Sequence, residues 1–261
     1  MQERHRNREQ YFKEQSITTE KYVIPFIESV FPLQSSVNIL EVGCGEGGNM
    51  LPFLRRGLRT VGVDLNKNKI ANARKFYAQQ TLPATPEFYH IDIYDWQTDE
   101  KYDLIMLRDV LEHIHHQERF MQFVKKFLKP NGKIFLGFPP WQNPYGGHQQ
   151  MFDSFIARLP YIHLLPKFLY RGLLSLAKED KSEINMAMEV KQTGITIERF
   201  LRIVKKEQYR IDRMQLYLIN PNYEVKFGLK PRKQAAIISH IPWIRNFITT
   251  TVYVVLSQNE E

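Results

Sequence analysis

The chain has little cysteine and no long apolar run. Cys44 is the only cysteine among 261 residues, so no disulfide can form within the chain. The longest apolar stretches, 161–177 and 241–256, are each interrupted by a proline and an arginine. Neither reaches the roughly 18 residues that a membrane-spanning helix needs. Residues 1–8 are charged with no apolar segment behind them, unlike a secretion signal, and we therefore expect a reducing cytoplasmic compartment.

Internal repeats and low-complexity tracts are also missing. Basic residues outnumber acidic ones, but they are scattered along the chain. The chain has 36 Lys and Arg against 28 Asp and Glu, a net charge of +8. This excess favours an anionic partner such as nucleic acid, a phospholipid surface or a phosphorylated substrate. No basic block with interleaved aromatics stands out, so we interpret most of these charges as solvated helix faces. Peripheral contact with a membrane stays open as an alternative.

The most informative segment is an apolar strand that runs into a glycine-rich turn. Residues 37–42 are apolar apart from Asn38 and Glu41, and Gly43, Gly45, Gly47 and Gly48 follow, with a helix expected from residue 49. Glycines allow positive φ and a close approach of the backbone to a ligand, and the amides of a helix N-terminus face the same crevice. The segment predicts a nucleotide-type ligand above residues 43–48.

Two glycine patterns fit this turn. Gly43-x-Gly45-x-x-Gly48 satisfies the dinucleotide fingerprint. Glu41-x-Gly43-x-Gly45-x-Gly47 resembles motif I of the class I S-adenosylmethionine (SAM) methyltransferases. SAM carries a sulfonium and an ammonium group and no phosphate, so a carboxylate at the strand end is useful where a pyrophosphate would be repelled. Glu41 therefore favours SAM.

Acidic residues also end the next two predicted strands. Asp64 lies 17 residues after Gly47 (64 − 47), where a carboxylate can accept both ribose hydroxyls of either cofactor. The strand at 87–91 is followed by Asp92 and Ile93, which resembles the adenine-binding corner of the methyltransferases. This resemblance implies that Asp92 takes the adenine amino group and that Ile93 or Tyr94 covers the ring. Leu65, next to Asp64, is a further expected cofactor contact.

Two later segments strengthen the resemblance. Residues 102–114 are similar to the "YDxIxxxxxLEHI" segment of the ubiquinone-biosynthesis-like and type-11/type-23 methyltransferases. Residues 127–139 contain Leu-Lys-Pro-Asn-Gly where that family has an "LKPGG" turn. The order and spacing of these segments across 36–141 are more specific than any one of them.

Strands alternate with helices in this region, which predicts a parallel sheet. We expect strands at 37–42, 60–63, 87–91, 102–107 and 133–138, closed by an antiparallel pair at 209–218 and 252–256. The fold class is a Rossmann-like, doubly wound, seven-stranded α/β sheet. One domain spans 1–261: an N-terminal helical segment (1–35), the SAM-binding core (36–141), a helical lid inserted after the fifth strand (142–190) and the rest of the sheet (191–261).

The family resemblance implies roles for the remaining site residues. Gly43, Gly45 and Gly47 would line the methionine part of SAM, with Glu41 serving its ammonium group through backbone or water. Arg108 would border the sulfonium. A cation there should point toward the acceptor and bind an anionic group of it.

Histidines at the site have more than one interpretation. His148 follows Gly146-Gly147 after the fifth strand, and it could remove a proton from an acceptor hydroxyl or simply fix the lid by a hydrogen bond. Both stay open. No metal is expected, since one helix turn cannot aim His113, His115 and His116 at one ion. Cys44 is interpreted as a small residue that fits the turn.

These patterns predict in-line transfer of the SAM methyl group, leaving S-adenosylhomocysteine (SAH). The apolar lid favours a small-molecule, lipid-like or glycan acceptor, with O- or C-methylation preferred. Residues 107–110 lack the Asn-Pro-Pro-Tyr-type tetrapeptide of nucleic-acid N-methylating enzymes, which disfavours nucleic acid. No obligate protein partner is evident. The alternatives are a non-catalytic SAM-fold binding module and an NAD(P)-dependent oxidoreductase, for which no Tyr-x-x-x-Lys pair is found.

Overall fold

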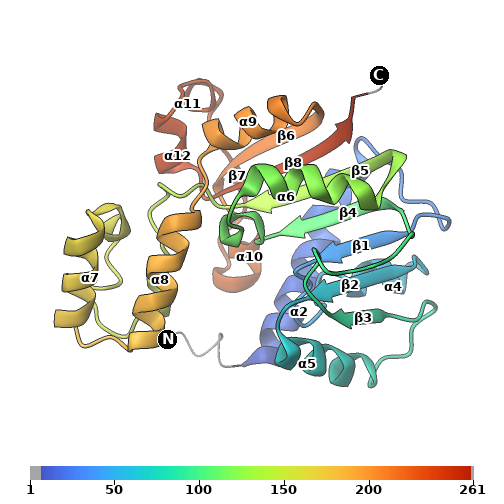
Figure 1. Ribbon diagram of the computed structural model, residues 1–261, viewed down its shortest axis with the longest axis horizontal. Helices are drawn as coiled ribbons and strands as arrows, with labels where there is room; N and C mark the ends of the chain where they lie inside the picture. The colour runs from blue at the N-terminus through green and yellow to red at the C-terminus, as the bar shows by residue number, and fades with distance from the viewer. Residues whose placement is uncertain (1–6, 260–261) are drawn as a thin grey trace.

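The computed structural model describes residues 7–259, and its centre is one sheet of eight strands (Figure 1). The sheet order is β3-β2-β1-β4-β5-β8-β6-β7. The strands are β1 Ile39–Val42, β2 Thr60–Asp64, β3 Glu87–His90, β4 Tyr102–Arg108, β5 Leu128–Phe138, β6 Tyr209–Ile219, β7 Arg232–Lys233 and β8 Thr251–Gln258. β1 to β5 are parallel, and β8 runs antiparallel to both β5 and β6.

The predicted doubly wound α/β fold is confirmed, with one difference in strand count. β7 is an additional eighth strand, a two-residue edge that pairs with the end of β6. Its sequence, Arg232-Lys233 after Pro231, has no apolar alternation. Edge strands of this length need no buried face, so hydrophobic periodicity cannot reveal them.

The helices include a long N-terminal run and a series of short segments. The α-helices are α2 Arg8–Thr18, α3 Ile24–Glu28, α4 Leu51–Arg55, α5 Lys67–Tyr77, α6 Gln117–Val124, α7 Lys167–Leu176, α8 Lys181–Thr193, α9 Ile197–Lys206, α10 Asn222–Phe227, α11 Ala236–Ser239 and α12 Ile244–Ile248. A π-helical turn, η1 Thr19–Val23, joins α2 to α3. Short 3₁₀ turns are η2 Leu111–His113, η3 Lys125–Phe127, η4 Gln149–Met151 and η5 Ile162–Leu164.

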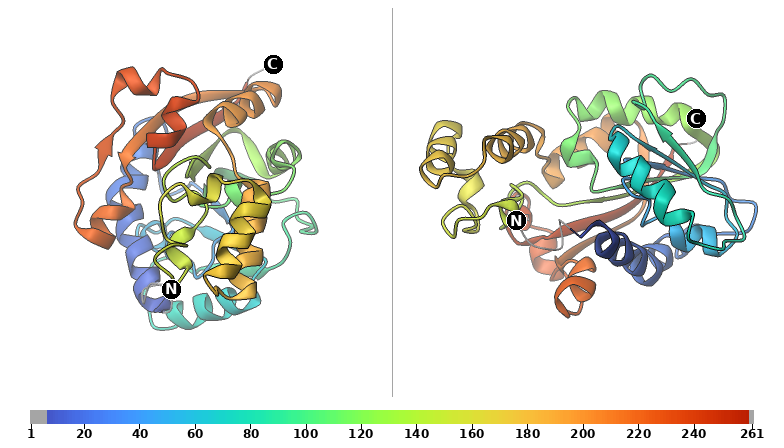
Figure 2. Two further views of the ribbon diagram at one scale, coloured as in Figure 1. Left: turned by 90° about the vertical axis from the view of Figure 1, so that its left-hand side faces the viewer. Right: turned by 90° about the horizontal axis from the view of Figure 1, so that it is seen from below.

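Two helical layers cover the two faces of the sheet (Figure 2). On one face, α6 and α9 pack with Phe120 and Phe200 against alternate strand residues such as Leu40. On the other face, Ile24 of α3 packs against the strand residues that point the opposite way, such as Ile39. Because successive strand residues point to opposite faces, the continuous apolar strands serve both layers. Helices α2 and α3 lie within the predicted N-terminal segment, whereas the helix after the glycine turn begins at Leu51 rather than 49 and has five residues. Residues 1–6 of the predicted N-terminal segment lie outside the described part.

The segment 142–190, for which the sequence predicts a lid, forms a separate small layer. Its helices α7 and α8 project beyond the carboxyl ends of the parallel strands (Figures 1 and 2). It has its own cluster of buried side chains, including Phe152, Tyr170, Leu174 and Met188. Thr193, at the end of α8, donates a hydrogen bond to the Glu112 carbonyl, which fixes the lid to the turn after β4. Within residues 7–259, no helix combines the length and hydropathy needed to cross a bilayer.

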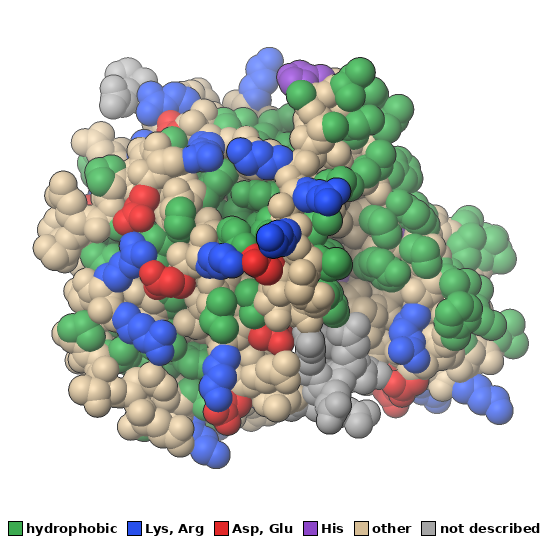
Figure 3. All heavy atoms as spheres, turned by 180° about the vertical axis from the view of Figure 1, so that it is seen from behind, with side chains coloured by type: hydrophobic (Ala, Val, Ile, Leu, Met, Phe, Trp, Pro, Cys, Tyr) green, Lys and Arg blue, Asp and Glu red, His purple; other side chains and the backbone are tan. Residues whose placement is uncertain are grey.

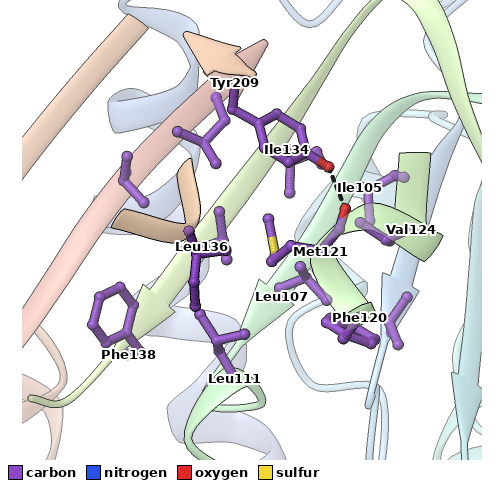
Figure 4. Close-up of a cluster of buried hydrophobic side chains, with 14 of the residues drawn as sticks. Ile105, Leu107, Leu111, Phe120, Met121, Val124, Ile134, Leu136, Phe138 and Tyr209 are labelled. Atoms are coloured by element: carbon purple, nitrogen blue, oxygen red, sulfur yellow. Dashed lines mark hydrogen bonds between the residues drawn. The ribbon is translucent and has the colours of Figure 1, made fainter. Parts of the chain in front are cut away.

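Figure 4 shows a buried polar contact within the core on the α6 face. The Tyr209 hydroxyl donates to the Met121 carbonyl at 2.7 Å, among Leu107, Ile134 and Leu136. This bond joins the start of β6 to the interior of α6. Burial raises the pKa of Tyr209, so the hydroxyl stays protonated as a donor.

Substituting Tyr209→Phe should lower the free energy of unfolding by about 1 kcal/mol, because the aromatic packing is kept and one buried hydrogen bond is lost. Urea denaturation would measure it. Tyr89→Phe is the matched control: the hydroxyl of this exposed tyrosine bonds the partly exposed Glu87 carboxylate, so its removal should cost under about 0.5 kcal/mol. Equal losses in the two variants would contradict this account of the α6 face.

Candidate cofactor and acceptor site

The glycine turn after β1 has the left-handed backbone that its sequence predicts. Gly43, Gly45 and Gly47 have φ values of +72°, +56° and +79°. The turn is held from both sides, since the Gly43 amide donates to the Val63 carbonyl at 2.8 Å. The Gly47 carbonyl accepts from the buried Tyr77 hydroxyl at 2.7 Å. The turn is therefore a rigid feature at the carboxyl ends of the central strands.

Beside this turn lies a cavity of about 640 Å³. Five predicted cofactor residues line it together: Gly43, Asp64, Leu65, Asp92 and Ile93. They come from the ends of β1, β2 and β3, at the edge where open α/β sheets bind ligands. Tyr94, Asp109, Val110 and His113 are further lining residues. The described residues that line this cavity do not include the other predicted cofactor residues, Glu41, Gly45, Gly47 and Arg108.

Asp64 joins the second strand to the glycine turn. Its Oδ2 accepts the Gly45 amide at 2.8 Å and its Oδ1 accepts the Asn66 amide at 2.7 Å. Each carboxylate oxygen retains a further lone pair, which can face the cavity. Asp64 is thus fixed in orientation and still able to accept hydroxyl groups of a ligand.

Asp92 and its neighbours form the opposite wall. The Asp92 Oδ1 accepts the Tyr94 amide at 2.9 Å, which closes a tight turn directly after β3. Ile93 is buried on the main core, and the Tyr94 ring packs on Phe123 with centroids 4.6 Å apart. An apolar side chain beside a carboxylate suits a flat base with an exocyclic amino group.

Glu41 lies beneath the glycine turn in a buried polar network. Its Oε1 accepts from Asn49 Nδ2 at 2.7 Å. The Asn49 Oδ1 accepts from Arg108 Nη1 at 2.7 Å and from the Thr19 hydroxyl at 2.9 Å. Glu41 Oε2 has no hydrogen-bond partner among the described residues. Burial raises the pKa of Glu41 to about 8, against the opposing effects of the Asn49 hydrogen bond and the Arg108 charge.

The Arg108 side chain has a different orientation from the one expected. It is only 3% exposed, and Nη1 bonds both Asn49 and Thr19 instead of extending toward open space. A buried guanidinium needs acceptors, and the N-terminal helix with its Thr19 supplies one that sequence reasoning did not consider. A role of Arg108 toward an acceptor stays a prediction.

His148 comes close to the cavity through His113. The two rings meet edge to face with centroids 5.1 Å apart, and His113 lines the cavity. His148 has a left-handed φ of +59°, at the start of η4 in the lid. Glu112 joins them, with its ligand-type atoms and theirs within 4.8 Å of one another. His115, in contrast, pairs with Glu189 on α8. Burial raises the pKa of Glu112 and lowers that of His113, so both favour their neutral forms. The expectation of no metal stays a prediction.

Asp109 is a site residue that the sequence analysis missed. It follows β4 directly, has a φ of +55°, and its side chain is 46% exposed where it lines the cavity. Burial is the largest cause that raises the pKa values of Tyr11 and Tyr223, and the negative charge of Asp109 is the second largest. These residues lie on α2 and α10, which are far apart in sequence. The signal was present, because an acid at the carboxyl end of a central parallel strand is a typical ligand contact.

Replacing Gly47 by Ala should lower the free energy of unfolding by about 2–4 kcal/mol, because φ is +79° and a Cβ would lie 2.9 Å from Phe88 and 3.0 Å from Tyr77. Gly57→Ala is the matched control, with φ +77° and no atom within 4 Å, and should cost about 1 kcal/mol. Urea denaturation of both variants measures the difference. Equal losses would mean that the turn tolerates the added methyl group.

Glu41→Gln should flatten the pH dependence of stability. A folded-state pKa near 8 means that the native protein binds a proton that the unfolded chain, with an ordinary pKa of 4.5, has lost. Stability is therefore fully present below pH 4.5 and falls as pH rises toward 8, by up to about 1.4 kcal/mol per pH unit. Denaturation at pH 5, 6, 7 and 8 should show the wild type losing stability relative to E41Q.

The exposed Glu9 serves as control for this titration. Its hydrogen bond with Lys13 lowers its pKa, so Glu9→Gln should leave the decline between pH 5 and 8 in place. Parallel curves for wild type and E41Q would contradict a buried, protonated Glu41.

Comparisons with known proteins agree with this geometry. The family model described as "Methyltransferase domain" matches residues 12–159. The ubiquinone biosynthesis O-methyltransferase of Bartonella bacilliformis is 30% identical over 121 residues, 45% of this chain and 48% of the relative. That of Rickettsia felis is 27% identical over 116 residues, 44% and 47% of the two chains. The chain thus spans about half the length of these curated relatives.

Solved structures share the fold at low sequence identity. A SAM-dependent methyltransferase from Clostridium acetobutylicum has a TM-score of 0.57 at 12% identity, covering 94% of this chain and 92% of the other. Geranyl diphosphate C-methyltransferase from Streptomyces coelicolor, solved with Mg²⁺, geranyl diphosphate and SAH, has a TM-score of 0.57 at 13% identity, covering 90% and 79%. The predicted Rossmann-like architecture is confirmed by both.

Proposed function

Since the chain belongs to the methyltransferase-domain family, we propose that it is an enzyme that binds SAM in the 640 Å³ cavity and transfers its methyl group to a small-molecule or lipid-like acceptor. The observation that carries the proposal is the convergence of Gly43, Asp64 and Asp92 on one cavity. Two carboxylates and a glycine turn suit a nucleoside that carries positive charge and no phosphate.

The residues present fit this cofactor. Asp64 would accept the ribose hydroxyls, and Leu65 would lie against the sugar. Asp92 would take the adenine amino group, with Ile93 against the ring. The glycine turn would approach the methionine part, and Glu41 Oε2, a buried oxygen without a partner among residues 7–259, would serve the ammonium group through backbone or water. An ammonium group nearby would favour the ionised form of Glu41.

The protein's part in the reaction is orientation and exclusion of water. When bound, SAM supplies an activated methyl group, so no activation of the donor by a side chain is needed. The cavity walls hold the donor, and the lid helices α7 and α8 cover the end of the sheet from which the acceptor would approach. His148, whose ring meets that of His113 edge to face, would accept a proton if the acceptor is a hydroxyl. Asp109 would contact the acceptor from the end of β4.

The relatives support the substrate class. The curated relatives are ubiquinone biosynthesis O-methyltransferases, and one structural neighbour is a C-methyltransferase of geranyl diphosphate. Both names refer to methylation of small or lipid-like molecules at oxygen or carbon. The partly apolar lid is in keeping with such an acceptor, and we infer O- or C-methylation as the reaction.

SAM and SAH should stabilise the protein and NAD should not. A ligand at about 100 times its Kd adds roughly 2.7 kcal/mol to the free energy of unfolding, which thermal denaturation detects.

Asp92→Asn should raise the Kd of SAH about tenfold in calorimetry, because a charged hydrogen bond to adenine is lost. Asp95→Asn, three residues further along and outside the cavity lining, is the matched control and should bind like the wild type.

The outcomes separate the alternatives. Stabilisation by NAD alone would support the oxidoreductase instead. Binding of SAM without SAH release in an acceptor screen of quinone precursors, prenyl diphosphates and glycan intermediates would support a non-catalytic binding module. Equal effects of D92N and D95N would remove Asp92 from the site.

A further inference from the structure

Two segments far apart in the sequence carry most of the large exposed apolar side chains. The first includes Phe155, Phe168 and Leu176, which are 78%, 73% and 86% exposed. The second includes Ile237 and Trp243, which are 74% and 56% exposed. The other exposed apolar residues of the two segments are Ile156, Leu159, Tyr161, Leu169, Phe227, Leu229, Ile241, Ile244, Phe247 and Ile248. Large exposed apolar patches mark contact sites.

The two segments form one surface. The Tyr161 hydroxyl donates to the Phe247 carbonyl at 3.0 Å, and their rings lie 6.4 Å apart. Arg158 of the first segment and Leu229 of the second line one cavity of about 420 Å³. Figure 3 shows hydrophobic side chains gathered along the right-hand side of that view, with Lys and Arg side chains among them. We name this surface, made by residues 155–176 and 227–248, the basic apolar face.

Charge on this face has one sign. No Asp or Glu occurs from 154 to 178 or from 225 to 258, although the chain has 28 of them. The basic residues of the face are Arg158, Lys167, Arg171, Lys230, Arg232, Lys233 and Arg245. Arg245 is compensated by Glu198 from α9 at 3.0 Å. The other six basic residues give the face a net positive charge.

Helix α7 has the composition of a helix that lies on a bilayer. It buries Tyr170 and Leu174 on the lid cluster and exposes Phe168, Leu169 and Leu176 on its outer side. Lys167 and Arg171 stand beside these exposed residues. Apolar side chains with flanking cations insert at the headgroup boundary, and Trp243 is a residue type enriched there.

We propose that the basic apolar face docks the protein on the surface of an anionic phospholipid bilayer. The apolar side chains enter the headgroup region, and the lysines and arginines contact lipid phosphates. The charge decides for this occupant: a face with cations and no acid complements an anionic surface, whereas two copies of it would repel each other. The inference does not depend on the proposed methyl transfer, because it concerns a surface outside the cofactor cavity.

Vesicle co-sedimentation of the full chain tests the proposal. Vesicles of phosphatidylcholine with about one third phosphatidylglycerol should bind the protein at least tenfold more tightly than vesicles of phosphatidylcholine alone. Raising salt from 0.1 to 1 M should weaken the binding, because electrostatic attraction is screened. Equal binding to both vesicles, or no binding to either, overturns the proposal.

Two sets of exposed substitutions assign the binding to the face. Phe168→Ser with Ile237→Ser, and Lys167→Glu with Lys230→Glu, should each weaken binding at least tenfold. The matched controls are Ile17→Ser with Tyr89→Ser and Lys67→Glu with Lys101→Glu, which are exposed elsewhere and should bind like the wild type. Unchanged thermal denaturation and unchanged SAH binding show that the variants are folded. Equal effects of test and control variants, or a stable dimer without vesicles that F168S/I237S abolishes, contradict bilayer docking.

Discussion

The site depends on one carboxylate that ties two strands together. Asp64, at the end of β2, holds the Gly45 amide of the turn after β1 and the Asn66 amide of its own turn. The parallel arrangement places both strand ends at the same edge, so one side chain can order both turns. A charge-assisted bond to a backbone amide is stronger than a neutral one. The side chain that we propose to bind ribose is therefore also the one that shapes the wall around it.

A second constraint links the N-terminal helices to the end of the sheet. Asn49 accepts from Thr19 and Arg108 with its oxygen and donates to Glu41 with its nitrogen. A buried cation and a buried carboxyl are thus joined by one neutral amide instead of by a direct salt bridge. Such a network is costly when incomplete, and Glu41 Oε2 is its incomplete member among the described residues. An ammonium group of a ligand would complete it, which connects the stability of this region to occupancy of the site.

Sequence patterns predicted the parts of the molecule that depend on local order. The glycine turn, the acids after β2 and β3, and the alternation of strand and helix follow from short segments, and the structure has them where expected. Arg108 was placed on the correct strand, but its orientation depends on Thr19, which lies 89 positions earlier. The contact between His113 and His148 likewise depends on how the lid returns to η2. Long-range side-chain contacts of this kind leave no periodic signal in the sequence.

The net charge of the chain is a second property whose arrangement in space could not be predicted from the sequence. As a total over 261 residues, +8 favours no particular arrangement, and basic residues are dispersed along the sequence. Stretches without acids also occur at 65–86 and 119–152, and what distinguishes 154–178 and 225–258 is that they also carry most of the large exposed apolar side chains. Folding brings these two stretches into contact at Tyr161 and Phe247. Neither stretch is long enough in apolar residues to span a bilayer, but side by side they combine apolar area with one sign of charge. The face therefore arises from the tertiary structure, and a count of charges could not have revealed it.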